Sequence, residues 1–216
     1  MTLENETRKA STTMPTARLE MFSDGVFAIA ITLLILEIKI PKHEDLIGSG
    51  GLFNYLVHLW PSYLSYILSF ILVGIYWANH HWLFSFVEKT DHYFNLLNIL
   101  FLMTVAFMPF SSAILGDFVS DPENRNAAVF AYSFGLLIPV PPVLAVYLYA
   151  TYNHRLVNPK LSKKFISSGT YKLIGSLCFS SLAVGFSFSY PWVSLSIIVL
   201  ILLVFLMPPA QPEFEN

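Results

Sequence analysis

The segment from Arg18 to Pro41, RLEMFSDGVFAIAITLLILEIKIP, decides the fold class. Between Asp24 and Glu37 it contains no charged residue, and with its flanks it approaches the roughly 20 apolar residues that a membrane-spanning helix needs. Its first turns nevertheless carry Arg18, Ser23 and Asp24, and a carboxylate is costly in hydrocarbon unless it is paired or hydrogen-bonded. The segment therefore predicts a membrane helix whose polar start faces neighbouring helices.

Composition indicates that the whole chain is of this kind. Of its 216 residues, 55% are hydrophobic and 12% are charged, and the mean hydropathy is +0.61, whereas soluble domains carry about 25% charged residues. The charges crowd into short segments between apolar runs, which is typical of a multi-pass membrane protein. A net charge of −2 does not favour nucleic acid as a partner. Cys178 is the only cysteine, which excludes an internal disulfide and a cysteine-based metal cage.

The apolar runs predict an all-α integral membrane protein with one six-helix domain over residues 18–207. Six transmembrane helices are expected at about 18–40, 63–87, 93–115, 127–152, 170–190 and 192–207. Residues 1–17 are expected to be disordered, and 208–216 to form an unstructured tail. Pro139, Pro141 and Pro142 should kink the fourth span.

Two further features concern the membrane surfaces. Gly48–Pro61 is expected to form one short helix at the interface, because its apolar residues recur at helical spacing and Trp60 follows them. Basic residues set the orientation, since they favour the cytoplasmic side. With the N-terminus inside, the inner segments hold Arg8, Lys9, Arg18, Lys89, Arg155, Lys160, Lys163, Lys164 and Lys172, and the outer segments hold only Lys39, Lys42 and Arg125. Both termini are therefore expected in the cytoplasm of a cell-membrane protein.

A polar network is expected where the first helix starts. The second helix ends at the same face with IYWANHHWLF, residues 75–84. The polar side chains of both helices, with Phe22 from the motif of the first helix, make up the candidate network: Arg18, Phe22, Ser23, Asp24, Asn79, His80 and His81. Adjacent residues on a helix do not share a face, so a metal site that uses both histidines is not expected. The simpler alternative is that Ser23 and Asp24 cap the helix start while Arg18 reaches towards the headgroups.

The other side of the first helix is apolar. Ile29, Leu33 and Leu36 lie at positions i, i+4 and i+7 and form one stripe, with Thr32 at its edge. Any membrane helix offers such a stripe to lipid or to other helices, so the pattern alone does not assign it a function.

A resemblance gives the stripe a meaning. The string Arg18-xxx-Phe22-Ser23-Asp24, followed by GVFAIAITLL, is similar to the signature of the transmembrane protein 175 family of potassium channels. The likeness extends to six spans and to a Trp/Asn/His-rich end of the second helix. It implies a single-repeat prokaryotic member that assembles as a homotetramer with the first helix lining the pore. It also implies that Ile29 forms the narrowest ring, that Leu33 and Leu36 form successive rings outwards, and that Thr32 forms a hydroxyl layer.

The expected function is therefore a potassium-selective channel, not an enzyme, with a hydrophobic constriction and no carbonyl selectivity filter. The bilayer and monovalent cations are its expected partners, potassium is the permeant ion, and no metal or other cofactor is expected. The acidic residues Glu37, Glu44 and Asp45 would concentrate cations at the outer mouth. A secondary transporter is the main alternative, and a membrane enzyme that uses Asp24, His80 and His81 is the second.

Overall fold

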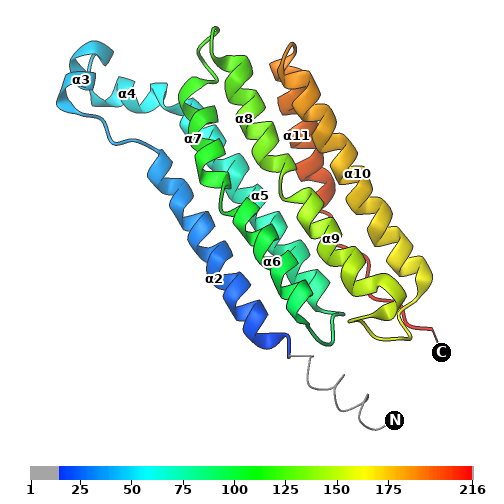
Figure 1. Cartoon of the computed structure of the whole chain (residues 1–216). Coiled ribbons are helices and arrows are strands. Elements are labelled where there is room, and N and C mark those ends of the chain that lie inside the picture. The colour runs from blue at the N-terminus through cyan, green and yellow to red at the C-terminus, as the bar shows by residue number, and fades with distance from the viewer. Residues whose placement is uncertain (1–14, 216) are drawn as a thin grey trace, which may run out of the picture.

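The computed structural model describes residues 15–215, and its long helices run side by side in one bundle (Figure 1). Within these residues there are helices and two isolated β-bridges but no strand. In chain order the helices are α2 (Ala17–Leu33) with the 3₁₀ turn η1 (Leu34–Glu37), α3 (His43–Ser49), α4 (Leu52–His58), α5 (Trp60–Phe84), α6 (His92–Val105), α7 (Met108–Phe118), α8 (Arg125–Leu137), α9 (Val140–Thr151) with η2 (Tyr152–His154), α10 (Lys163–Ser187) and α11 (Pro191–Phe205). Most of the expected disordered segment, residues 1–14, lies outside the described residues.

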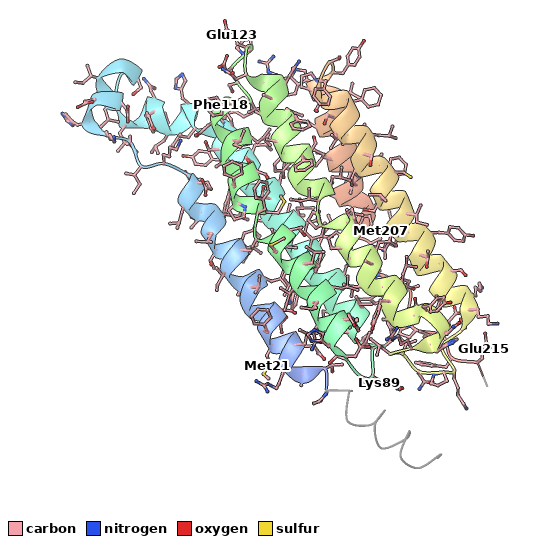
Figure 2. The ribbon with its side chains drawn as sticks, in the orientation of Figure 1. Met21, Lys89, Phe118, Glu123, Met207 and Glu215 are labelled. Carbon is pink, nitrogen blue, oxygen red and sulfur yellow. The ribbon has the colours of Figure 1, made fainter. Side chains whose placement is uncertain are left out.

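The bundle has two distinct ends. One end, called the base here, holds the start of α2, the loop 85–91, the loop 155–162 and the C-terminal tail (Figures 1 and 2). The opposite end, called the rim, holds α3, α4, the loop 119–124 and the corner 188–190. In Figure 2, Met21, Lys89 and Glu215 mark the base, and Phe118 and Glu123 mark the rim.

Within residues 15–215, four helical segments are long and apolar enough to cross a membrane: Ala17–Glu37, Trp60–Phe84, His92–Phe118 and Arg125–His154. α11 is apolar but shorter, and α10 begins at Lys163 rather than near residue 170. The side chain of Ser162 explains this early start, because it caps α10 by accepting a hydrogen bond from the backbone N–H of Phe165 at 3.1 Å. The lengths and the apolar composition define an all-helical membrane protein.

Prolines divide two of these segments. α8 ends at Leu137 and α9 begins at Val140, and Pro139, Pro141 and Pro142 lie at the junction, which confirms the expected kink in the fourth span. The third segment is divided in the same way, since α6 ends at Val105 and α7 begins at Met108 just before Pro109. A proline lacks the N–H that the preceding turn needs, so each segment bends where its hydrogen-bond ladder is interrupted.

A short helix does form within Gly48–Pro61, because α4 covers Leu52–His58. The sequence did not predict α3, the second short helix that precedes it, and both project sideways from the rim (Figure 1). The chain turns between them at Gly50 and Gly51, whose φ angles are +75° and +113°. Only glycine adopts these angles without steric cost, so the Gly50-Gly51 pair ends α3 and separates the two helices.

The C-terminal tail is also more ordered than expected. Its backbone returns to the base and pairs with the loop before α10: the N–H of Ser162 donates to the carbonyl of Glu213 at 2.8 Å, and Leu161 forms a β-bridge with Phe214. The indole N–H of Trp82 at the end of α5 donates to the carbonyl of Ala210 at 2.9 Å. These backbone partners, which composition does not reveal, explain why the proline-rich tail is held in place.

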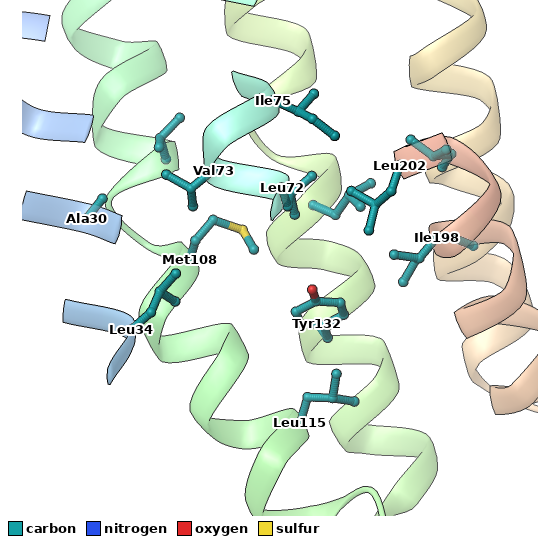
Figure 3. Close-up of a cluster of buried hydrophobic side chains, with 14 of the residues drawn as sticks. Ala30, Leu34, Leu72, Val73, Ile75, Met108, Leu115, Tyr132, Ile198 and Leu202 are labelled. Atoms are coloured by element: carbon teal, nitrogen blue, oxygen red, sulfur yellow. The ribbon is translucent and has the colours of Figure 1, made fainter. Parts of the chain in front are cut away.

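Buried apolar side chains join the helices into one core. The central cluster takes residues from seven α-helices and from η1, and its members include Leu34, Val73, Met108, Tyr132 and Ile198 (Figure 3). A second cluster, centred on Phe94, Tyr147 and Phe165, fills the base. Burying these side chains, each worth roughly 1.5–3 kcal/mol when transferred from water, fixes the arrangement of α2 against the remaining helices.

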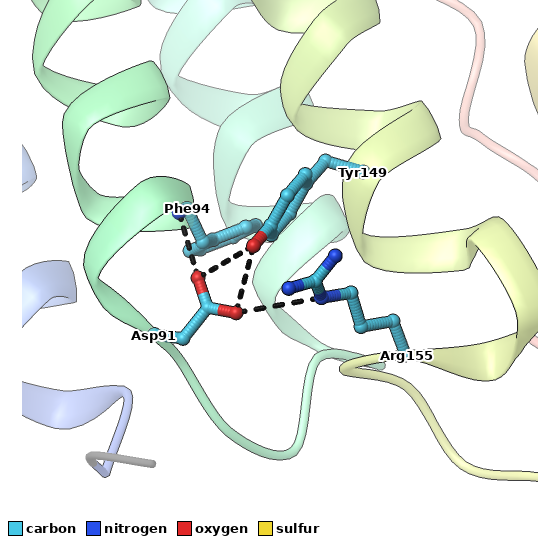
Figure 4. A network of polar contacts seen from close by, with 4 residues as sticks. All are labelled: Asp91, Phe94, Tyr149 and Arg155. Carbon is cyan, nitrogen blue, oxygen red and sulfur yellow. Dashed lines mark hydrogen bonds and ion pairs between the residues drawn. The ribbon is translucent and has the colours of Figure 1, made fainter. Parts of the chain in front are cut away.

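A polar cluster at the base ties α6 to α9 (Figure 4). Asp91 caps α6 by accepting a hydrogen bond from the backbone N–H of Phe94 at 2.9 Å. The hydroxyl of Tyr149 donates to the Asp91 carboxylate, 2.8 Å from Oδ2, and Arg155 Nε lies 3.5 Å from the same oxygen. Arg155 also stacks over the Tyr149 ring, 4.3 Å from its centre. The carboxylate therefore acts at once as a helix cap and as the link between two loops.

The contact between α7 and α8 gives a first testable prediction. A Cβ atom added at Gly135 would lie 2.3 Å from Oγ and 2.7 Å from Cβ of Ser111, so Gly135→Ala forces the two helices apart. We expect a loss of about 1–3 kcal/mol of stability, seen as a lower midpoint of thermal unfolding in detergent. Gly185→Ala is the matched control, because a Cβ there meets nothing within 4 Å. Equal midpoints for the two variants would contradict the close approach.

Candidate pore-lining helix and its polar anchor

α2 has one buried face and one exposed face. Its buried residues, Ser23, Phe27 and Ala30, are continued by Leu34 in η1 and recur at helical spacing against the rest of the bundle. Only 22% of the span Ala17–Glu37 is buried, against 33–44% for the other three candidate spans. The first helix is therefore the least covered of these four spans in the isolated chain.

The exposed face carries the predicted apolar stripe. Ile29, Leu33 and Leu36 are 62%, 42% and 71% exposed, and Phe22 extends the stripe towards the base at 53%. The α-helix ends at Leu33, so Leu36 lies on the 3₁₀ turn η1 instead of on the straight helix that the sequence predicted. Four bulky apolar residues thus lie uncovered along one side of α2 and η1.

Thr32 lies beside this stripe, and its hydroxyl proton already takes part in hydrogen bonds within α2. Thr32 Oγ1 donates within its own helix, 2.8 Å from the carbonyl oxygen of Ala28 and 3.0 Å from that of Ile29. Because the proton points back to the backbone, the oxygen lone pairs remain free on the exposed side. The Thr32 side chain therefore offers an acceptor, which is the character that a cation requires.

A chain of directed hydrogen bonds anchors the opposite side of α2. His80 Nε2 on α5 lies 2.9 Å from Asn98 Oδ1 on α6. Asn98 Nδ2 donates to Ser23 Oγ at 3.0 Å, and Ser23 Oγ donates to the carbonyl of Leu19 at 2.8 Å. Each proton in this chain is committed in one direction, so Nε2 of His80 carries a proton and donates it. Ser23, Asn98 and His80 are 0%, 0% and 3% exposed.

Asp24 is held by a different partner. Its Oδ1 accepts a hydrogen bond from the indole N–H of Trp77 on α5 at 2.9 Å. The rings around the network add packing: His80 stacks on Phe84 and Phe101 with centroid distances of 4.5 and 5.9 Å, and its edge meets Phe27 at 5.5 Å. Together the two polar links fasten the start of α2 to both α5 and α6.

The structure thus brings together some of the expected network residues and not others. Ser23, Asp24 and His80 take part in bonds between helices, while Asn79 Nδ2 donates to the Ile75 carbonyl of its own helix at 2.8 Å. His81 stacks on Trp77 at 6.0 Å. The side chains of Arg18 and Phe22 are exposed and make no hydrogen bond or ion pair with another described residue. The alternative in which Ser23 and Asp24 only cap the helix is not what the contacts show.

Sequence reasoning missed Trp77 and Asn98. The available signal was Asn98 itself, a polar residue in the middle of the apolar run NLLNILFL, because such residues commonly bond across helices in membranes. Among the described residues, no group of three or more His, Cys, Asp or Glu side chains is placed to hold a metal ion.

Comparisons with known proteins agree with this architecture. The family model described as "Endosomal/lysosomal potassium channel TMEM175" matches residues 18–109. A potassium channel of Chryseobacterium is 32% identical over 207 residues, which cover 93% of this chain and 97% of that protein. A potassium channel of Streptomyces collinus is 42% identical over 144 residues, 67% of this chain and 68% of that protein.

A solved structure matches as well. The crystal structure of a lysosomal potassium-selective channel TMEM175 homolog from Chamaesiphon minutus superposes with a TM-score of 0.79 at 34% identity, covering 88% of this chain and 96% of that one. The animal relatives are longer: a Gallus gallus protein named as an endosomal/lysosomal proton channel is 37% identical over 118 residues, only 23% of its length.

The bundle and its exposed first helix define a membrane protein of the channel class, not an enzyme. The chain belongs to the TMEM175 family, and it matches a bacterial member over 97% of that member's length.

Proposed function

We propose that this chain is the pore-forming subunit of a potassium-selective channel of the cell membrane. In this proposal six helices per subunit cross the membrane, both termini lie in the cytoplasm, and four copies gather around one axis that is lined by α2. The observation that carries it is the uncovered, bulky apolar face of α2, the least buried of the four candidate spans. The bacterial relatives named as potassium channels and the potassium-selective homolog support the choice of ion.

The proposed selectivity rests on dehydration. In a four-fold assembly, Ile29, Leu33 and Leu36 each form an apolar ring that offers no ligand to an ion. An ion that crosses such a ring sheds part of its water, and potassium, which holds water less tightly than sodium, loses less in doing so. The result is a moderate preference for potassium, without the backbone carbonyl filter of other potassium channels, and apolar rings also close a pore by dewetting.

Flux through the purified chain tests this function. Liposomes that contain only this protein should pass potassium faster than sodium, and planar bilayers should show discrete single-channel steps. A saturable flux without steps would instead indicate the transporter alternative. Because the longer animal relatives are named as proton channels, a pH-sensitive dye belongs in the same assay, and proton flux without potassium flux would contradict the proposal.

Replacing Thr32 tests the hydroxyl layer. We expect Thr32→Ala to lower the permeability ratio of potassium over sodium by about twofold to fivefold, the scale of one modest polar interaction, while current persists. The reason is that the acceptor lone pairs beside the Ile29 ring are lost. Thr32→Ser keeps the hydroxyl and should keep the ratio, which is measured from reversal potentials in mixed ions. A ratio unchanged in Thr32→Ala would remove this residue from the selective layer.

A further inference from the structure

An apolar groove lies between α10 and α11 towards the base, outside the proposed pore. It is lined by Lys172, Gly175, Ser176, Phe179, Leu200, Ile201, Val204 and Phe205, and it measures about 560 Å³ with its open mouth. On α10 the lining residues follow one another at i, i+3, i+4 and i+7, so they form a single stripe over two turns. The groove therefore runs along α10, and Lys172, the only charged residue that lines it, lies at its base end.

The groove continues into the bundle. Ser176, Ile201 and Phe205 also line a second apolar pocket, which reaches Tyr76 and Asn79 on α5. At Gly175 a Cβ atom would meet nothing within 4 Å, so the groove is open where this glycine lies. The lining extends over two turns of α10 and is apolar except for Lys172 and Ser176, which suits a hydrocarbon chain with a charged group at one end.

Lys172 is the unusual element of the groove. It is half-buried, and its Nζ lies 4.8 Å from the centre of the Phe205 ring. The ion pairs of residues 15–215 are Lys39–Asp117 and Arg155–Asp91, so Lys172 has no carboxylate partner within the described chain. A partly buried ammonium is costly without an anion, and the remaining lining offers only the Ser176 hydroxyl as a polar group. The missing partner of this site is thus an anion attached to something apolar.

We propose that the α10–α11 groove binds an anionic phospholipid, whose phosphate pairs with Lys172 and whose acyl chain lies along Gly175 and Phe179. Lys172 is level with Phe205, the last residue of α11, so the phosphate would lie just beyond the end of that helix. A zwitterionic lipid fits less well, because its own cation competes with Lys172 for the phosphate. The site is independent of the proposed pore, since none of its residues lies on α2.

Native mass spectrometry of the full chain, released from detergent mixed with phosphatidylglycerol and phosphatidylcholine, tests this site. The wild-type chain should retain phosphatidylglycerol in preference to phosphatidylcholine. Lys172→Gln should weaken retention of phosphatidylglycerol about fivefold, the factor that corresponds to about 1 kcal/mol for one basic residue at a charged lipid surface. Lys172→Arg should keep the preference. Lys164→Gln is the control, because Lys164 is exposed in the first turn of the same helix.

A second substitution tests the acyl-chain part. Gly175→Leu fills the groove and should lower retention of both lipids, whereas Gly185→Leu, on the same helix but outside the groove and also free of neighbours within 4 Å, should not. Retention that is equal in wild type, Lys172→Gln and Gly175→Leu would overturn the proposal. It would also be overturned if Lys172→Gln changed the oligomeric state without changing lipid retention, because Lys172 would then pair with a second copy of the chain.

Discussion

Replacing Ile29 with asparagine is expected to raise potassium current about tenfold or more and to bring the permeabilities of potassium and sodium close together. In the proposed tetramer, Ile29 faces the axis with 62% of its surface uncovered by its own subunit. A ring of amide oxygens takes the place of the water that each ion loses, so the difference in dehydration free energy between potassium and sodium no longer affects permeation. A tenfold gain corresponds to a barrier lowered by about 1.4 kcal/mol. Bilayer recordings of unitary current and of reversal potentials in mixed ions measure both effects.

The same substitution elsewhere on the segment provides the control. Ile35 is 50% exposed but lies six residues from Ile29, roughly a third of a turn away around the helix, so it does not share the stripe. Ile35→Asn should leave the ion preference as in the wild type. If Ile29→Asn left the reversal potentials unchanged, or if both variants abolished the preference equally, the stripe of α2 would not be the constriction.

The exposed stripe and the polar anchor differ in how far the sequence determines them. The spacing of Ile29, Leu33 and Leu36 alone predicts that they share a face, because helical periodicity is a local property. That this face stays uncovered depends on which residues of α5, α6 and α7 pack on the other side. The sequence alone does not tell lipid, a second copy and a water-filled pore apart, and the resemblance in the first helix supplied that step.

The anchor shows the reverse case. Ser23, Asp24 and His80 were expected to bond between helices because polar groups in apolar spans need partners. Their partners depend on the relative depth of three helices, which local patterns do not encode. Asn98 lies level with both Ser23 and His80, and Trp77 reaches Asp24, whereas Asn79 turns back to its own helix. The relative depth of the three helices therefore decides which polar residue on each helix bonds to a neighbouring helix.

Asn98 is therefore the residue whose loss should most disturb the base of α2. Asn98→Leu preserves volume and apolar packing but removes both hydrogen bonds that the amide makes. His80 is only 3% exposed, so its Nε2–H is then buried without an acceptor. An unsatisfied buried donor lowers the free energy of unfolding by about 1–3 kcal/mol. Since α2 bears the proposed constriction, we expect a lower thermal unfolding midpoint in detergent together with a large loss of potassium flux.

The neighbouring asparagine on α6 supplies a matched comparison. Asn95 Oδ1 is buried without a hydrogen-bond partner among residues 15–215, so Asn95→Leu removes an unsatisfied polar atom instead of a bonded one. Replacing such a group by an apolar side chain of similar shape is neutral or stabilising, and the unfolding midpoint should equal or exceed that of the wild type. The two variants make the same chemical change one helical turn apart. A similar loss of stability in both would mean that polar groups on α6 contribute only through helix packing, and that the chain His80–Asn98–Ser23 does not hold α2 in place.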